Sequence, residues 1–216
     1  MNKSLLFSCL LVIQFSYAQQ QHPFQEEVNT IVKRYDSIWT PDLPTVVFTG
    51  SSSIRLWEEL PELFPQYQVI NSGFGGSMTA DLCHFSQDLI SRYQPKKVII
   101  YEGDNDLNDN IKPMVIRRQM KGLIEVIKKE HDSVQVLLIA AKPSPSRWHL
   151  KNRFKRLNRK FKRLCKKDKQ LTYVNIWDPM ILDDKQVRPD IFLEDGLHMT
   201  DEGYKIWYNV LKNHLN

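Results

Sequence analysis

The chain has 216 residues, of which 42% are hydrophobic and 25% charged, and its formal net charge at pH 7 is +5. This length suits one domain with a substantial core. Beyond residue 18 the only cysteines are Cys83 and Cys165, which excludes a disulfide scaffold, and no segment is apolar enough to cross a membrane.

The first eighteen residues have the pattern of a secretory signal peptide. Lys3 supplies the positive start, residues 5–16 form a short apolar run, and SYA at 16–18 is a small-x-small cleavage signal. The apolar run is shorter than the roughly twenty residues that a membrane-spanning helix needs. We therefore predict cleavage before Gln19, a single mature domain over residues 19–216, and a secreted or periplasmic location.

Short segments rich in Val and Ile alternate with longer segments of helical periodicity along the rest of the chain. Continuous apolar runs are typical of parallel strands that are buried on both faces. The expected strands are residues 46–49, 69–71, 98–101, 136–140 and 173–176. The expected helices are residues 24–35, 54–63, 80–93, 114–131, 148–167 and 200–215. This alternation predicts an α/β protein, a three-layer sandwich.

Four segments rich in glycine and polar residues each follow a different expected strand. They are GSSS at 50–53, NSGFGGS at 71–77, GDND at 103–106 and DGLH at 195–198. Sites in open parallel sheets form outside the carboxyl ends of the strands, at the point where the strand order reverses. The four segments are therefore expected to meet at one edge of the sheet.

Ser52, Asp195 and His198 are the residue types of a serine-hydrolase triad. His198 can accept the proton of the Ser52 hydroxyl as it attacks a carbonyl carbon, and Asp195 can fix the imidazole tautomer and stabilise its charged form. The tetrahedral intermediate needs donors aimed at its oxyanion, and a glycine N–H in a tight turn and an Asn amide are suitable. Gly76 and Asn105 fit that role.

In these blocks the chain resembles the SGNH hydrolases, also called the GDSL-like lipase/acylhydrolase family, over nearly the whole expected mature domain. By this resemblance Ser52 matches the block I nucleophile, Gly76 the block II glycine and Asn105 the block III Asn. Asp195 and His198 match the block V Asp-x-x-His. The resemblance implies a flavodoxin-like five-stranded parallel sheet in the order 2-1-3-4-5, an oxyanion hole built from Ser52, Gly76 and Asn105, and no metal or organic cofactor.

Block I departs from the family pattern, because Ser51 stands where the family name expects Asp. Ser51 and Ser53 also flank the expected nucleophile, so a register shifted by one residue is an alternative. We retain Ser52 because the geometry of the turn determines which side chain points outward. The sequence GSSSIRLW is similar to a sub-branch of the family that resembles platelet-activating-factor acetylhydrolase-type esterases.

Phe74, Arg147 and Trp148 are candidate substrate-binding residues. Residues 142–150 follow the fourth expected strand, and two prolines stiffen this segment. Arg147 and Trp148 can therefore form a wall of the substrate cleft, although a rigid loop that caps a helix explains the segment equally well. The same two interpretations apply to Phe74, which lies beside the glycine pair.

Residues 151–169 are strongly basic, with eleven Lys or Arg among nineteen residues. An apolar stripe at helical spacing predicts that one face of this helix packs on the sheet and that the outer face is basic. Such a face can contact anionic lipid headgroups or acidic polysaccharide, or it can simply be solvated. Nucleic acid is not an expected partner for an exported protein.

The sequence as a whole predicts an exported serine esterase that hydrolyses short acyl esters, above all acetyl groups on carbohydrates, through an acyl-enzyme intermediate. Lysophospholipids or thioesters are the second substrate class. A non-catalytic carbohydrate- or lipid-binding domain is the alternative from a different functional class. No spacing of His, Cys and Asp resembles a metal site.

Cys83 and Cys165 are expected to remain unpaired. They lie on helices that follow the second and fourth strands, and the helix 114–131 should separate them in the expected sheet order. Neighbouring helix axes lie about 8–10 Å apart, so the two cysteines should be roughly 16–20 Å apart. A disulfide requires Cα atoms within about 7 Å.

Overall fold

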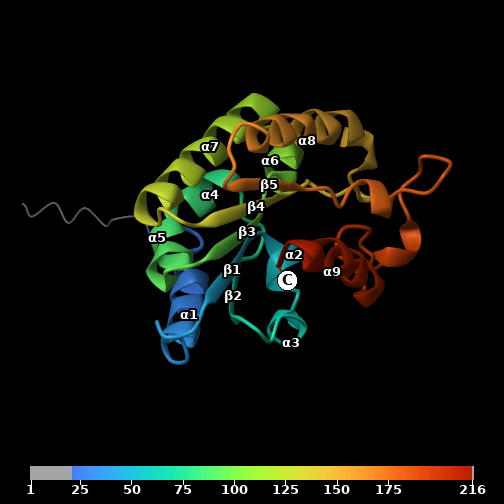
Figure 1. The fold of residues 1–216 in the computed structure, drawn as a ribbon. Coiled ribbons are helices and arrows are strands. Elements are labelled where there is room, and N and C mark those ends of the chain that lie inside the picture. The colour runs from blue at the N-terminus through green and yellow to red at the C-terminus, as the bar shows by residue number, and fades with distance from the viewer. Residues whose placement is uncertain (1–20, 216) are drawn as a thin grey trace, which may run out of the picture.

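Five parallel strands form the centre of the computed structural model (Figure 1). They are β1 (Thr45–Gly50), β2 (Gln68–Gly73), β3 (Lys97–Tyr101), β4 (Gln135–Ile139) and β5 (Leu171–Val174). Their order is β2-β1-β3-β4-β5, which confirms the predicted flavodoxin-like topology. The structure describes residues 21–215, so the predicted signal peptide lies outside the described residues.

Helices cover both faces of the sheet and complete the predicted three layers. One face carries α1 (Gln25–Asp36), α4 (Thr79–His84), α5 (Ser86–Leu89), α7 (Pro113–Glu130) and α8 (Lys151–Cys165). The other carries α2 (Ser52–Arg55), α3 (Leu60–Leu63) and α9 (Asp201–Leu215). The short α6 (Asp104–Asn108) follows β3. The chain also forms short 3₁₀ helices, namely η1 (Ser91–Tyr93), η2 (Trp148–Leu150), η3 (Asp178–Met180) and η4 (Pro189–Ile191). Within residues 21–215, no helix has the length and apolar character needed to span a bilayer.

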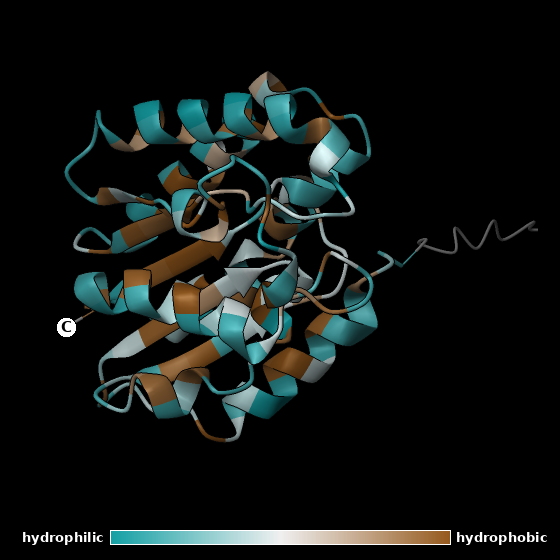
Figure 2. Ribbon diagram, turned by 90° about the vertical axis from the view of Figure 1, so that its right-hand side faces the viewer, coloured by the Kyte–Doolittle hydropathy of each residue, from teal (hydrophilic) through white to brown (hydrophobic). Residues whose placement is uncertain are grey.

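The core is divided by the sheet into two hydrophobic layers. Along β1, Val47 packs into the layer under α7 and α8, whereas Val46 and Phe48 pack into the layer under α9. Successive strand residues point to opposite faces, so a strand that is covered on both faces is apolar at every position. Figure 2 shows these brown strands enclosed by helices whose outer surfaces are mostly teal. The core therefore explains the continuous Val- and Ile-rich runs of the sequence.

The prediction of one continuous helix over residues 54–63 is wrong. The chain forms α2 and α3 with a break between them, and Asn71 on β2 explains the break. Its Nδ2 donates to the carbonyl oxygens of Ile54, at 2.9 Å, and Trp57, at 3.0 Å. The Ile54 carbonyl also accepts from the backbone N–H of Trp57 at 2.9 Å, and the Asn71 amide takes the place of a further helical turn at these two carbonyls.

The helix predicted over residues 80–93 is also divided, into α4, α5 and η1. The division falls at Phe85, and the hydroxyl of Ser86 donates to the carbonyl of Cys83 at 3.1 Å. Serine side chains compete in this way with the helical backbone ladder. The remaining expected helices are present within a few residues of their predicted ends, with residues 148–150 of the fifth forming η2.

Cys83 and Cys165 are free, as predicted. The helix α7 packs against both α4 and α8 and so separates the two cysteines. Burial raises the pKa of Cys83 to about 11 and that of Cys165 to about 12, so both thiols are protonated at neutral pH.

Candidate active site

A sharp turn at the end of β1 positions Ser52. Gly50 has φ of +128°, and a Cβ at this position would lie 1.9 Å from the carbonyl oxygen of Tyr101. Gly50 is paired with both Gly73 on β2 and Tyr101 on β3, so it ends the strand at the point where the strand order reverses. The chain leaves the sheet there, and Ser52 begins α2 at the predicted edge.

The three consecutive serines have different surroundings. Ser51 and Ser53 are 1% and 2% exposed. The hydroxyl oxygen of Ser53 accepts a hydrogen bond of 3.0 Å from Lys142. Only Ser52 is partly exposed, and only its hydroxyl lies against a histidine.

Ser52, His198 and Asp195 form a continuous hydrogen-bonded chain. The Ser52 Oγ lies 3.0 Å from Nε2 of His198, and His198 Nδ1 lies 2.5 Å from Oδ2 of Asp195. The other carboxylate oxygen of Asp195 accepts from the backbone N–H groups of Leu197, at 2.8 Å, and His198, at 2.9 Å. A short turn thus holds the carboxylate and the imidazole together.

These contacts determine the charge of Asp195. Burial acts to raise the pKa of this carboxyl, but the N–H groups of Leu197 and His198 and the His198 ring outweigh burial and lower the pKa to about 2. Asp195 is therefore ionised at neutral pH. A carboxylate in this state favours a proton on Nδ1 of His198, which leaves Nε2 free to accept the proton of Ser52.

Asn105 is the second residue of α6, and two partners fix the orientation of its amide. Its Nδ2 donates to the Ser77 carbonyl oxygen at 2.9 Å, and its Oδ1 accepts from Nη2 of Arg147 at 2.8 Å. An amide nitrogen has two hydrogens, so one remains to donate to another acceptor. Arg147 thereby lies at the predicted site, where it contacts Asn105.

Gly76 lies in the turn after β2, is exposed, and has φ of +74°. Over residues 21–215, the backbone N–H groups of Gly76 and Ser52 have no protein acceptor. Together with the free amide hydrogen of Asn105, they provide three donors of the kind that an oxyanion hole requires.

A buried ionic cluster supports this edge and was not predicted from the sequence. Lys142, which is 1% exposed, extends its Nζ to within 3.4 Å of Oδ2 of Asp104 and 3.3 Å of the Tyr101 hydroxyl. The Tyr101 hydroxyl donates to the same carboxylate oxygen at 3.0 Å, and Arg147 Nη1 lies 3.1 Å from it. Arg147 therefore connects the buried carboxylate to Asn105.

The cluster keeps opposite charges together in the interior. Burial acts to raise the pKa of Asp104, but Lys142 and Arg147 hold it below its usual range. Burial also lowers the pKa of Lys142, and the Asp104 carboxylate opposes this effect. Asp104 lies in the GDND block at 103–106, and Lys142 begins the segment 142–150 that follows the fourth expected strand. Their pairing becomes visible only when the order of β3 and β4 is known.

A second buried acid supports Asn105 from the other side. Glu102 directly follows β3, and its Oε1 accepts from the Ser77 hydroxyl at 2.7 Å. Burial raises the pKa of Glu102 well above its usual range, so this carboxyl retains its proton more strongly than an exposed one. Ser77 in turn accepts the hydrogen bond from Asn105 through its carbonyl oxygen.

Two of the three expected substrate-binding residues lie elsewhere. Phe74 is fully buried, with its ring packed edge-on against Phe24 at 5.3 Å and Phe85 at 6.2 Å, which favours the structural interpretation of this residue over contact with substrate. A buried aromatic side chain contributes to the core instead. Trp148 stacks beside Trp177 and lines a neighbouring pocket that includes none of the triad residues.

In the described part of the chain, no group of His, Cys, Asp and Glu side chains has an arrangement suited to a metal ion.

The family model of the GDSL-like lipase/acylhydrolases matches residues 43–206. No curated protein matches the sequence. Among solved structures, the chain is similar to a candidate platelet activating factor from Streptococcus pneumonia, with 20% identity, a TM-score of 0.78, and coverage of 89% of this chain and 92% of that chain. It is also similar to a GDSL-like lipase from Bacteroides thetaiotaomicron, with 22% identity, a TM-score of 0.76, and coverage of 87% of this chain and 96% of that chain. A third similar structure is an acetylxylan esterase from Geobacillus stearothermophilus, with 13% identity, a TM-score of 0.68, and coverage of 83% of this chain and 96% of that chain.

At these identities the solved structures establish the fold. The family model adds the sequence pattern, and its match includes every strand and all five residues of the predicted blocks. The chain therefore belongs to the GDSL-like lipase/acylhydrolase family of carboxylic ester hydrolases.

Proposed function

We propose that this protein is a serine esterase in which Ser52 is the nucleophile, His198 the general base and Asp195 the residue that orients the base. The observation that carries the proposal is the continuous contact from Ser52 Oγ to His198 Nε2, at 3.0 Å, and from His198 Nδ1 to Asp195, at 2.5 Å. Nucleophile, base and orienting carboxylate within hydrogen-bond reach are the recognised signature of this chemistry.

In the acylation step, Ser52 Oγ attacks the carbonyl carbon of the ester while its proton moves to Nε2 of His198. The carbonyl oxygen becomes an oxyanion that accepts from the N–H groups of Ser52 and Gly76 and from Nδ2 of Asn105. When the tetrahedral intermediate collapses, the bond to the alkoxy oxygen breaks. The leaving alcohol takes the proton from His198, and the acyl group remains on Ser52.

In the deacylation step, a water molecule transfers a proton to His198 and attacks the acyl carbon. The same donors stabilise the second oxyanion, because the geometry of the intermediate is the same. Collapse breaks the bond to Ser52 Oγ, and His198 returns the proton to this oxygen. The products are the carboxylic acid and free enzyme.

The proposed substrates are short acyl esters, with acetyl groups on carbohydrates as the first choice. The predicted site residues include the Asn105 amide, which the Arg147 guanidinium contacts, and within residues 21–215 the connections between strands contain no long apolar insertion of the kind that forms a lipase lid. The structural similarity to an acetylxylan esterase is consistent with this choice.

The test is a series of p-nitrophenyl esters from acetyl to octanoyl, with acetylated xylan and lysophospholipid assayed in parallel. We expect acetyl and butyryl esters to be hydrolysed fastest, and Ser52→Ala to have no measurable turnover on any of them. A preference for octanoyl esters or lysophospholipid would favour the lysophospholipase or thioesterase alternative. Hydrolysis of none of these esters would favour a non-catalytic binding module.

Export is part of the proposal and depends on the pattern of residues 1–18 alone. N-terminal sequencing of the protein purified from its source should begin at Gln19. Recovery of the protein with Met1 intact would contradict the proposal of a cleaved signal peptide.

A further inference from the structure

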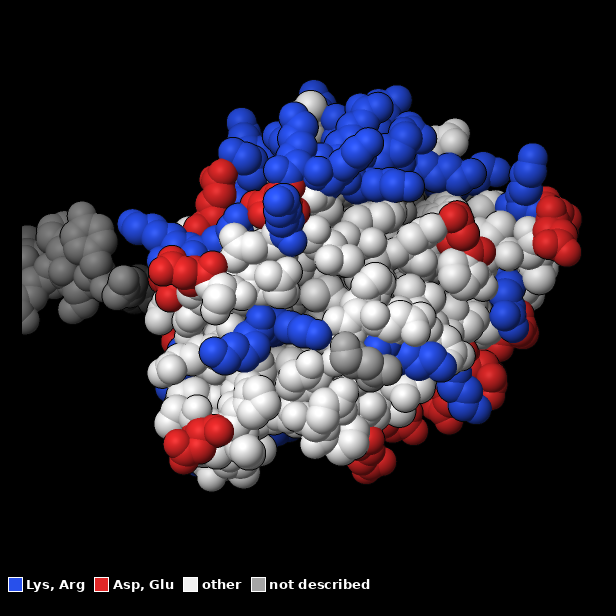
Figure 3. Space-filling view, in the orientation of Figure 1, with Lys and Arg blue, Asp and Glu red and all other residues white. Residues whose placement is uncertain are grey.

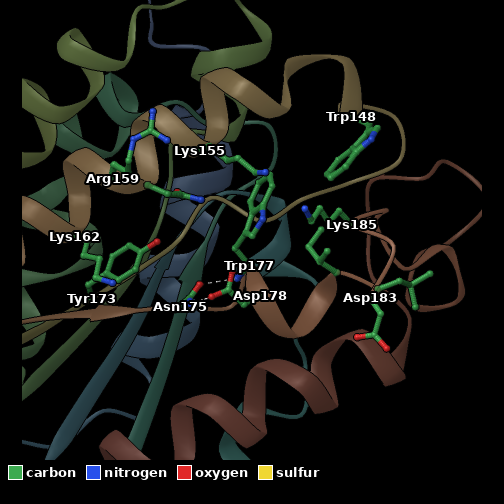
Figure 4. Close-up of a pocket in the computed structure, with 13 residues that line it drawn as sticks. Trp148, Lys155, Arg159, Lys162, Tyr173, Asn175, Trp177, Asp178, Asp183 and Lys185 are labelled. Carbon is green, nitrogen blue, oxygen red and sulfur yellow. Dashed lines mark hydrogen bonds between the residues drawn. The ribbon is translucent and has the colours of Figure 1, made fainter.

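A pocket of about 600 Å³ lies between α8 and the chain that follows β5 (Figure 4). It is separate from the triad, but the two sites are adjacent in the chain. Arg147 contacts Asn105, whereas the next residue, Trp148, lines the pocket. One turn of backbone therefore contributes to both sites, and neither the ester chemistry nor the family assignment explains the pocket.

The α8 wall of the pocket is cationic. Lys155, Arg159 and Lys162 have the i, i+4, i+7 spacing that places side chains on one helix face, and Lys185 lines the pocket from the opposite segment. Over residues 21–215, none of these four side chains forms an ion pair. The α8 sequence has no acidic residue, and Figure 3 shows the resulting basic surface along this side of the molecule. The positive charge of these four side chains is therefore not paired, and it favours the binding of an anion.

The opposite wall is aromatic. Trp148 and Trp177 lie nearly parallel, with an interplanar angle of 20° and ring centroids 6.1 Å apart. Tyr173 also lines the pocket, on the other side of Trp177 from Trp148 (Figure 4). Indole rings provide apolar faces against which the C–H face of a sugar ring can pack.

The end of the pocket near η3 supplies hydrogen-bond acceptors and donors. Asn175 and Asp178 are connected by a hydrogen bond of 2.6 Å, and Asp183 lies farther along the same segment. Carboxylate and amide oxygens accept from hydroxyl groups, which a sugar ring presents around its edge.

We propose that this pocket binds a uronic-acid residue of an acidic oligosaccharide. Its ring packs against the partly exposed Trp148, which stacks on the buried Trp177. Its hydroxyls donate to Asp178 and Asp183, and its carboxylate lies against the α8 cations. Arg159 is suited to this last role because guanidinium and carboxylate form paired hydrogen bonds. The basic helix face of the sequence analysis is, on this proposal, a binding wall for an acidic saccharide.

The test measures binding of an unesterified galacturonate oligomer to the wild-type protein by calorimetry, with a neutral xylo-oligosaccharide of equal length for comparison. The absence of ester groups separates this result from the proposed esterase activity. The pocket variant is Arg159→Gln with Lys162→Gln. The matched control is Lys160→Gln with Arg163→Gln, which removes the same charge from the same helix but at residues that line a different groove.

We expect the galacturonate oligomer to bind and the neutral oligomer to bind at least tenfold more weakly. The pocket variant should raise the Kd at least tenfold at unchanged melting temperature, whereas the control variant should change it by less than about threefold. Trp148→Ala, at a partly exposed position, should also weaken binding at least tenfold.

Equal losses in the pocket and control variants would overturn the proposal, because they would show a diffuse electrostatic attraction. Equal affinity for the neutral oligomer would overturn the assignment of an anionic sugar. Binding to vesicles with anionic lipid, in the absence of binding to the oligomer, would overturn it in favour of a membrane contact.

Discussion

The two halves of the candidate active site are held by different means. Asp195 and His198 lie within four residues of each other on a surface turn, with side chains that are 46% and 26% exposed. Asn105, by contrast, is oriented by Arg147 and Ser77, which come from different loops and contact the buried acids Asp104 and Glu102, respectively. The base is thus positioned by local chain geometry, and the oxyanion donor by long-range polar contacts in the interior.

Because the two halves are held differently, substitutions in them should affect different properties, catalytic turnover in one half and folding stability in the other. An exposed ion pair contributes little to stability, because water screens and competes for it. A buried charge costs several kcal/mol to desolvate and is tolerated only when its partners are complete. Substitutions at the triad half should therefore abolish turnover without unfolding the protein, whereas substitutions in the buried network should first reduce stability.

His198→Ala should have the largest effect. Triad members act as a unit, so we expect kcat for a short p-nitrophenyl ester to fall by about 10⁴–10⁶, with the melting temperature nearly unchanged. His214→Ala, at an exposed position of α9, is the matched control and should retain wild-type turnover. Substantial activity in His198→Ala would show that another group acts as the base.

Lys142→Met should reduce stability more than any exposed lysine substitution. It leaves the buried Asp104 with an incomplete set of cationic partners, and breaking a buried pair costs about 3–5 kcal/mol. Urea unfolding measures the loss. Lys205→Met removes a fully exposed pair with Glu202 and should leave the urea midpoint nearly unchanged, because water screens such a pair. Similar losses in the two variants would contradict the distinction between the two halves.

Asn105→Ala should lower kcat by about 10²–10³ with little change in KM, because an oxyanion donor acts mainly in the transition state. Steady-state kinetics on the acetyl ester measures this. Asn108→Ala, an exposed residue at the end of the same short helix, controls for damage to α6. Full kcat in a folded Asn105→Ala protein would refute the oxyanion role.

Glu102→Gln should change mainly the pH dependence of stability. Burial raises the pKa of the folded-state carboxyl, so its contribution is fully present below the unfolded pKa and is lost as pH rises through the folded pKa. A glutamine does not titrate, so the unfolding free energy of the variant relative to wild type should be higher at pH 8 than at pH 5. An equal difference at both pH values would contradict the raised pKa.

The sequence predicted the strands and the candidate triad residues from local patterns. Continuous Val- and Ile-rich runs indicated strands that are covered on both faces, and each of the four polar blocks followed a different strand. The blocks were also matched by resemblance to a family, which supplied the order 2-1-3-4-5. The geometry found at Ser52 and His198 is consistent with the expected pairing.

The features that sequence analysis missed depend on contacts between distant residues. Asn71 ends α2 from another strand, and no pattern within residues 54–63 indicates this. In the sequence, Lys142 resembles any polar loop residue. Its contact with Asp104 can be inferred only when β3 and β4 are known to be neighbouring strands. Phe74 sits beside flexible glycines in the sequence, yet its ring lies in the core.

The central claim is that Ser52, and neither of its serine neighbours, is the nucleophile. The most direct test is to label the folded wild-type protein with a fluorophosphonate and to map the modified peptide by mass spectrometry. One adduct on Ser52 is expected, with none on Ser51 or Ser53, because those side chains are buried and only Ser52 contacts His198. An adduct on Ser51 or Ser53, or a folded protein that forms no adduct, would contradict the account.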